Sequence, residues 1–203
     1  MMRRIRRPRR LLASAFNLPN QLTFLRLGLA VVMFAMISRD AYLAALVLFV
    51  IAASTDWLDG YFARKYSQVT TLGRILDPFA DKVIICGAFI YMVALPEMQD
   101  VPGGLRAWMV VVIVGRELLV TALRSFLEDR GADFSAKTSG KLKMFLQCIA
   151  AGVGLYFLAR DAGPGPPPGW LWWALVTSTW AALVMTAYSG VIYVWVAVKV
   201  LRE

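Results

Sequence analysis

Residues 56–64 read Asp56-Trp-Leu-Asp59-Gly60-Tyr-Phe-Ala63-Arg64, and residues 73–81 read Gly73-Arg-Ile-Leu-Asp77-Pro-Phe-Ala-Asp81. Together they place four carboxylates inside segments that otherwise have the composition of a membrane helix. An acidic residue at bilayer depth is costly, so it indicates a functional site whose partner must be identified.

Helical periodicity gathers the charged and small residues of each stretch on one face. At about 100° per residue, one face of the first helix contains Asp56, Asp59, Gly60, Ala63 and Arg64. One face of the second helix contains Gly73, Asp77 and Asp81. Only a short polar link joins the two stretches. We therefore expect two antiparallel helices that turn their acidic faces toward a common pocket.

The composition of this pocket favours hard divalent cations. Four clustered carboxylates repel one another unless cations neutralise them. The chain contains no His, and its two Cys lie outside both stretches, so oxygen ligands alone remain, which suit Mg²⁺, Mn²⁺ or Ca²⁺. Gly60, Ala63 and Gly73 leave room for a bulky ligand to approach the backbone, and Arg64 is suited to pair with phosphate.

The rest of the chain predicts an integral membrane protein with one all-α domain. Its 203 residues are 59% hydrophobic, with a mean hydropathy of +0.61, which is too apolar for a soluble domain. We expect no cleavable signal peptide. Apolar runs separated by polar or Gly-Pro links predict six transmembrane helices, at about 21–39, 41–65, 73–95, 105–129, 139–160 and 170–201.

The distribution of positive charge predicts the topology. The net charge is +9, and six of the first ten residues are Arg. Residues 1–16 are expected to form a basic interfacial helix on anionic lipid, with a disordered basic tail as the alternative, and no nucleic-acid partner is expected. Residues 17–203 form the expected six-helix membrane domain. With both termini inside, the outer loops contain only Arg39, Arg106 and Arg160, while 19 of the 22 basic residues lie near the inner face.

A second group of charges is cationic and lies on the same predicted side as the aspartates. Arg116 and Arg124 fall about 80° apart on the fourth predicted helix, and Lys137, Lys141 and Lys143 surround the start of the fifth. Arginine binds phosphate through two hydrogen bonds and lysine as a point charge, so the group predicts a pocket for an anionic substrate. Ordinary flanking charge is the alternative, above all for Lys137 and Lys143. Glu117 is interpreted as an ion-pair partner of Arg116.

The spacing Asp-x2-Asp-Gly-x2-Ala-Arg-x8-Gly-x3-Asp-x3-Asp resembles the signature of the CDP-alcohol phosphatidyltransferase family at all eight fixed positions. The resemblance implies the fold of this family and the transfer of a phosphatidyl group from CDP-diacylglycerol to an alcohol. It implies that Mg²⁺ or Mn²⁺, with two ions expected, is held by Asp56, Asp59, Asp77 and Asp81. It also implies that Asp81 is the general base and that the nucleotide is bound by Asp56, Asp59, Gly60, Ala63, Arg64, Gly73 and Asp77.

Segments 17–26, 115–124 and 139–143 are similar to the branch of this family whose acceptor is sn-glycerol 3-phosphate. This likeness covers roughly residues 17–160, and Met144 departs from it where Thr is frequent. It implies that the phosphate of the acceptor is bound by Arg116, Arg124, Lys137, Lys141 and Lys143. The family resemblance further implies a homodimer. We expect a bacterial cytoplasmic membrane, with the active site toward the cytoplasm.

Alternative acceptors and one different function remain open. Within the family, the acceptor could be phosphatidylglycerol, as in the cardiolipin-synthase branch, or inositol phosphate, as in the phosphatidylinositol-phosphate-synthase branch. The cationic group disfavours serine and choline. Outside enzymes, a divalent-cation transporter could use the acidic cluster as its ion site, although Arg64 and the neighbouring glycines argue against a cation pathway.

Overall fold

The computed structural model describes residues 18–66, 73–128 and 138–202, and all regular secondary structure in these ranges is α-helical. Side chains are described for residues 21–55, 76, 78–127 and 140–200. The long helices of these ranges are α2 (Leu18–Ile37), α3 (Tyr42–Tyr66), α4 (Gly73–Val93), α6 (Ala107–Glu128), α7 (Thr138–Asp161) and α8 (Gly169–Arg202). They coincide with the six predicted segments, so the all-helical prediction is confirmed. The predicted interfacial segment 1–16 lies outside the described residues.

The helix boundaries follow turn chemistry that the sequence predicts in most places. Between α2 and α3, Asp40 adopts a left-handed backbone conformation (φ 56°), and the N–H of Ala41 donates to the carbonyl of Met36 at 2.9 Å. The Gly-Pro run between α7 and α8 is not helical, as expected. The predicted link 96–104 differs, because it contains a short helix, α5 (Pro96–Gln99). Proline at the first helical position, which has no N–H to satisfy, favours such a start.

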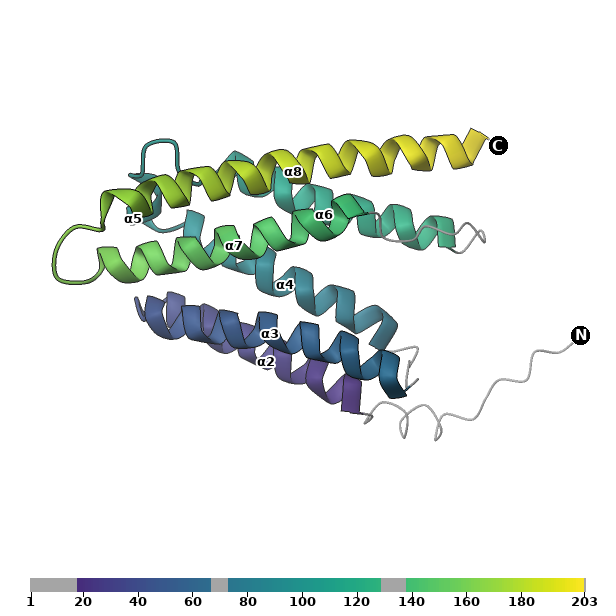
Figure 1. The fold of residues 1–203 in the computed structure, drawn as a ribbon, viewed down its shortest axis with the longest axis horizontal. Coiled ribbons are helices and arrows are strands. Elements are labelled where there is room, and N and C mark those ends of the chain that lie inside the picture. The colour runs from purple at the N-terminus through teal and green to yellow at the C-terminus, as the bar shows by residue number, and fades with distance from the viewer. Residues whose placement is uncertain (1–17, 67–72, 129–137, 203) are drawn as a thin grey trace, which may run out of the picture.

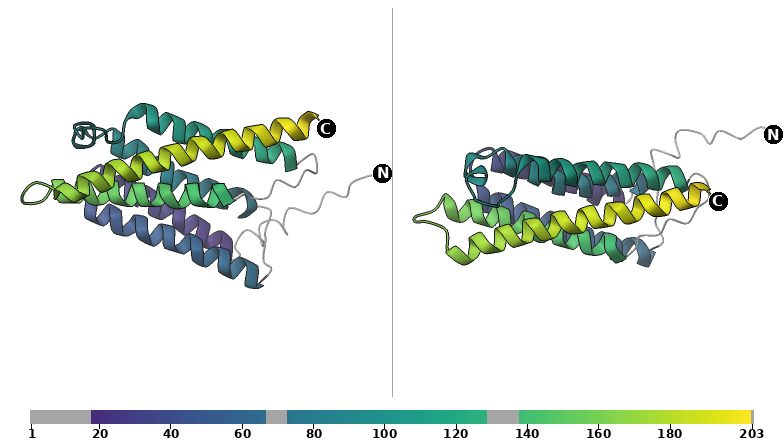
Figure 2. Two further views of the ribbon diagram at one scale, coloured as in Figure 1. Left: turned by 45° about the horizontal axis from the view of Figure 1, so that its top comes forward. Right: turned by 90° about the horizontal axis from the view of Figure 1, so that it is seen from above.

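The long helices run along the long axis of the molecule, and successive long helices run in opposite directions (Figure 1). The end of α3, the start of α4, the end of α6, the start of α7 and the C-terminus all lie at one end of the bundle, on the right in Figure 1 and in both views of Figure 2. Helix α4 is central, because it contacts α2, α3, α6 and α7. This arrangement places both motif-bearing helices beside the helices that carry the predicted cationic residues.

Close packing fixes α4 against α2. A Cβ atom on Gly87 would lie 2.1 Å from the ring of Phe34, so only glycine leaves room for this ring. The ring of Phe34 also stacks on that of Tyr91, with centroids 4.8 Å apart. The contact sets the approach of the two helices and thereby the position of Asp81, less than two turns away on α4.

The surface of the bundle is apolar and part of its interior is polar. Large apolar side chains are exposed on every long helix, for example Val111, Phe145 and Val191, whereas Arg26, Glu117, Lys143 and several hydroxyl groups are buried. Water would disfavour such a surface, and lipid would not. In the described ranges, two helical segments are long and apolar enough to cross a membrane, Gly140–Asp161 and Gly169–Val200, and shorter apolar ones are Gln21–Ile37 and Tyr42–Thr55. These helices indicate a membrane protein.

Candidate active site

The eight motif positions lie on two consecutive helices, as the sequence predicts. Helix α3 contains the first five and α4 contains Gly73, Asp77 and Asp81. The two helices contact each other, and the end of α3 and the start of α4 lie at the end of the bundle described above. Of the motif side chains, only that of Asp81 is described. The predicted side-chain roles of Asp56, Asp59, Gly60, Ala63, Arg64, Gly73 and Asp77, and of Lys137 in the second group, fall outside the described residues.

Asp81 forms a buried ion pair with an arginine of α2. Nη1 of Arg26 donates to Oδ1 of Asp81 at 2.7 Å. The Arg26 side chain is 1% exposed and that of Asp81 is 25% exposed, so the pair connects the interior to the open side of α4. A guanidinium group held in this way restricts the carboxylate to one orientation. The sequence motif does not include Arg26, although an arginine inside an apolar helix is itself a signal of a functional role.

A cavity lies beside this ion pair, between α2, α3, α4 and α7. Arg26 and Asp81 provide its charged side, and Phe49, Ala52 and Met144 belong to its apolar lining. Ala52 lies one helical turn before Asp56 on α3, so the cavity reaches the turn that precedes the motif. The small alanine side chain keeps this space open beside the predicted ligand positions.

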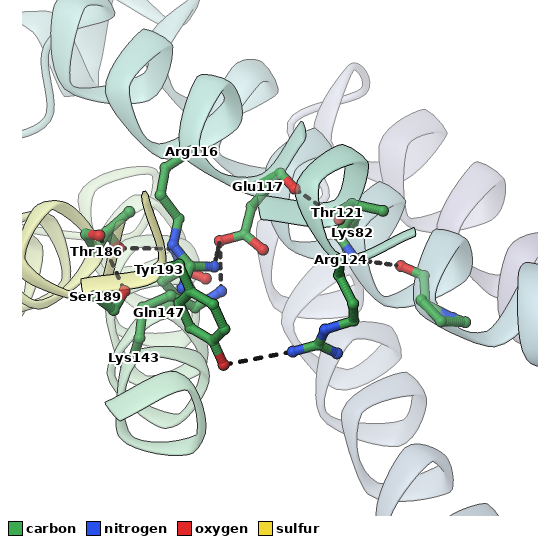
Figure 3. A network of polar contacts seen from close by, with 11 residues as sticks. Lys82, Arg116, Glu117, Thr121, Arg124, Lys143, Gln147, Thr186, Ser189 and Tyr193 are labelled. Atoms are coloured by element: carbon green, nitrogen blue, oxygen red, sulfur yellow. Dashed lines mark hydrogen bonds and ion pairs between the residues drawn. The ribbon is translucent and has the colours of Figure 1, made fainter. Parts of the chain in front are cut away.

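Two members of the cationic group, Arg116 and Lys143, form a buried polar network with Glu117 between α6 and α7 (Figure 3). One carboxylate oxygen of Glu117, Oε1, contacts Nζ of Lys143 and also lies 3.2 Å from Nη1 of Arg116. The side chains of all three residues are at least nine-tenths buried. The interpretation of Glu117 as an ion-pair partner is confirmed. Because its ammonium group is directed at Glu117, Lys143 connects α7 to α6 in this structure.

Two arginines of α6 retain unused hydrogen-bonding capacity. Among the described residues, nothing accepts a hydrogen bond from Nε of Arg116 or Nε of Arg124, although both nitrogens are buried. A buried donor without an acceptor costs free energy, so a bound acceptor atom is the simplest explanation for it. Lys141, the other described member of the predicted set, is exposed one turn into α7. The two arginines of α6 are therefore candidates for holding an anion.

The acidic and cationic groups meet at one turn of α4. Asp81 pairs with Arg26 of α2, while the next residue, Lys82, lies within electrostatic reach of Glu117 on α6. Nζ of Lys82 donates to the carbonyl of Pro78 at 3.0 Å, which keeps the ammonium group beside α4. The described cations of the network, Arg116, Arg124, Lys143 and Lys82, outnumber its carboxylate, Glu117. The site thus combines a carboxylate with an adjacent region of excess positive charge.

The predicted ligand set fits a hard divalent cation by its chemistry. All four predicted ligands are carboxylates, and carboxylate oxygens are the donors that Mg²⁺ and Mn²⁺ prefer. The chain offers no imidazole ligand, which softer metals would favour. Among the described side chains no group of three metal-ligating residues occurs, because Asp81 alone of the predicted four is described.

The fold and this site define a helical membrane protein in which a carboxylate-bearing helix packs beside a group of cationic side chains. The sequence model described as CDP-alcohol phosphatidyltransferase matches residues 16–188. The chain belongs to this family and is a transferase enzyme, and its family is generally dependent on divalent metals. The resemblance drawn from the eight-position motif is confirmed, and the match extends beyond residue 160 into α8.

Individual relatives are similar over most of their length. The chain is 40% identical over 150 residues to CDP-diacylglycerol–glycerol-3-phosphate 3-phosphatidyltransferase of Bacillus subtilis (strain 168), and the matched region covers 66% of this chain and 74% of that protein. It is 37% identical over 188 residues to the probable phosphatidylglycerophosphate synthase of Mycobacterium tuberculosis (strain ATCC 25618 / H37Rv), covering 90% and 82%. It is 34% identical over 166 residues to a CDP-diacylglycerol–glycerol-3-phosphate 3-phosphatidyltransferase of Pseudomonas fluorescens, covering 79% and 78%.

Proposed function

We propose that the protein transfers a phosphatidyl group from CDP-diacylglycerol to the 1-hydroxyl of sn-glycerol 3-phosphate and releases CMP, the reaction of a phosphatidylglycerophosphate synthase. The relatives named above support this substrate pair. The observation that carries the proposal is the position of Arg116 and Arg124 next to the helix of Asp81, with the Nε atom of each buried and without an acceptor among the described residues. Such a group suits an acceptor that carries its own phosphate.

The donor lipid is assigned to the motif on α3 and α4. In this proposal Asp56, Asp59, Asp77 and Asp81 hold two divalent ions, and the nucleotide is seated by Gly60, Ala63, Arg64 and Gly73 together with the first three aspartates. Mg²⁺ or Mn²⁺ bound there would offset the negative charge of the diphosphate and of the departing CMP. The three small residues let the nucleotide approach the helix backbone.

Asp81 acts as the general base of the reaction. It accepts the proton of the acceptor hydroxyl while the hydroxyl oxygen forms a bond to the phosphatidyl phosphorus and the bond from that phosphorus to CMP breaks. The ion pair with Arg26 supports this assignment, because it holds the carboxylate in one orientation. Arg26 is thus a positioning residue in this proposal. A carboxylate placed in this way meets the hydroxyl in a defined geometry. Orientation of the reacting groups provides much of the rate enhancement of such a site.

The acceptor phosphate is assigned to α6 and the start of α7. Arg116 and Arg124 bind it, with Lys141 and Lys137 adding positive charge. The burial of Lys143 against Glu117 supports a structural role for this lysine, which is to fix α7 to α6. The nearby network keeps an excess of positive charge, so the acceptor is favoured when it is anionic.

The protein acts as a multi-pass enzyme of a bacterial cytoplasmic membrane in this proposal. The apolar perimeter of the bundle supports six spans, and the acyl chains of the donor would extend sideways into lipid. Arg39, Arg106 and Arg160 flank the ends of helices opposite the motif, which supports cytoplasmic termini and a cytoplasmic active site. A homodimer is the expected assembly.

A purified-protein assay tests the proposal. CMP release is measured with CDP-diacylglycerol and, in turn, sn-glycerol 3-phosphate, phosphatidylglycerol, inositol phosphate and serine, with Mg²⁺, with Mn²⁺ and with a chelator. The expected result is metal-dependent release of CMP with sn-glycerol 3-phosphate and with none of the other three acceptors. Release with phosphatidylglycerol or inositol phosphate instead would reassign the acceptor. No release with any acceptor, together with divalent-cation uptake into vesicles, would favour a transporter.

A further inference from the structure

Tyr193 of α8 lies between the two arginines assigned to the acceptor (Figure 3). Cζ of Arg116 is 5.4 Å and Cζ of Arg124 is 5.9 Å from the centroid of the Tyr193 ring. Nη2 of Arg124 also donates to the Tyr193 hydroxyl at 3.4 Å. The ring is 2% exposed. Tyr193 follows the last residue of the family match, so neither the motif nor the family comparison identifies it.

The ring gives the two guanidinium groups a common reference point. Arg116 and Arg124 are eight residues apart on α6, so their Cα atoms lie about 12 Å apart along the helix axis. Long arginine side chains have many rotamers, and two like charges repel, so α6 alone does not bring the groups together. A neutral aromatic face attracts both cations within about 6 Å and limits where each can point. A phosphate binding between them then meets donors that are already placed.

The backbone around Tyr193 leaves room for these contacts. A Cβ atom on Gly190, one turn before Tyr193, would lie 3.0 Å from Cγ of Arg116. A Cβ atom on Gly140 of α7 would lie 3.1 Å from the Tyr193 hydroxyl. The absence of a side chain at Gly190 thus lets the aliphatic part of Arg116 pack against α8. The absence of one at Gly140 lets the Tyr193 phenol pack against α7. The ring also packs with Val120, Leu127 and Ala197, so it is fixed by apolar contacts on α6 and α8.

We propose that Tyr193 is a positioning residue for the acceptor, which holds Arg116 and Arg124 in the spacing that binds the phosphate of an anionic alcohol. This inference rests on the proposed function, because it takes the two arginines as the acceptor site. It adds a part of α8 that the donor-binding motif does not reach. The aromatic ring, rather than the hydroxyl, provides most of the effect, since 3.4 Å is long for a hydrogen bond.

Kinetics of Tyr193→Leu against Tyr188→Leu test the proposal. Tyr188 lies on the same helix but is 58% exposed on the apolar surface, so it provides the same substitution without the arginine contacts. Tyr193→Leu is expected to raise the KM for sn-glycerol 3-phosphate about tenfold, with the KM for CDP-diacylglycerol and kcat changed less than about twofold. Tyr188→Leu should leave all three constants unchanged. Tyr193→Phe should remain within about twofold of wild type, because it keeps the ring.

A binding measurement and a double substitution separate positioning from general damage. Thermal stabilisation of the detergent-purified protein by sn-glycerol 3-phosphate, without donor lipid, should require about tenfold more ligand in Tyr193→Leu. In an Arg124→Ala background, adding Tyr193→Leu should raise the KM much less than it does alone. Tyr193→Met, a flexible side chain of useful volume, gives the same tests if the leucine variant does not purify.

The outcomes distinguish failure of the proposed function from failure of the role proposed for Tyr193. A wild-type protein that releases no CMP with sn-glycerol 3-phosphate refutes the proposed function. A wild-type protein that is active, with a Tyr193→Leu variant whose KM for the acceptor is unchanged, refutes the role of Tyr193 alone. Equal rises in both KM values, or a full effect of Tyr193→Leu in the Arg124→Ala background, would also overturn it.

Discussion

Replacing Glu117 should destabilise the protein more than replacing its partner Lys143, and a structural role for Lys143 predicts that both replacements lower Tm. Glu117 is a buried carboxylate that contacts two cations, Lys143 and Arg116. Glu117→Gln keeps the shape of the side chain but leaves both cations without that carboxylate in a medium of low dielectric constant. Lys143→Met removes one cation, and Glu117 still has Arg116.

The magnitudes follow from these contacts. Breaking a buried ion pair by removing one partner costs about 3–5 kcal/mol, because the other charge remains buried. Glu117→Gln is at the upper end, since two cations lose their partner. Losing one hydrogen bond to a charged group while another remains costs about 1.5–3 kcal/mol, which we expect for Lys143→Met. For a chain of this size, 1 kcal/mol corresponds to about 2–4 °C in Tm.

The assay is thermal unfolding of the detergent-purified variants, followed by steady-state kinetics at a temperature where each is folded. Glu117→Gln should lower Tm by about 10–20 °C and Lys143→Met by about half as much, and the double variant should be less destabilised than the sum of the two. Lys143→Met should keep its KM for sn-glycerol 3-phosphate within about twofold. A Lys143→Met variant with an unchanged Tm and a strongly raised KM for the acceptor would refute the reasoning and return Lys143 to the acceptor site.

Substitutions at three further residues test the remaining roles. Asp81→Asn should abolish turnover while largely sparing binding of CDP-diacylglycerol, measured by equilibrium binding; full activity would remove Asp81 as the base. Arg26→Met should lower kcat at least about tenfold because the carboxylate of Asp81 loses its partner, and Arg26→Lys should recover part of the loss; activity equal to wild type in Arg26→Met would contradict the positioning role. Arg116→Ala should raise the KM for sn-glycerol 3-phosphate far more than the KM for CDP-diacylglycerol, and equal effects on both would exclude Arg116 from the acceptor site.

Local features of the chain were sufficient to predict where the long helices lie and which two of them carry the motif. Apolar runs of membrane length, separated by links such as the Gly-Pro run after Asp161, leave few other ways to satisfy the backbone. The spacing from Asp56 to Asp81 predicts a shared face on each of two consecutive helices, because helical periodicity is a property of the local backbone. The short helix α5 was not predicted, since its four residues form only one turn and carry little periodic signal.

The partners of the charged side chains depend on how distant helices pack, which no local pattern contains. Arg26 meets Asp81 across 55 positions of the chain, and Lys143 meets Glu117 across 26. Tyr193 reaches Arg116 and Arg124 because α8 packs against α6, although its own surroundings in the sequence are those of an ordinary apolar helix. Residue types showed which groups could bind metal, nucleotide or phosphate. Helix packing selected which of them stand together, because a contact between helices depends on crossing geometry and side-chain volume rather than on neighbours along the chain.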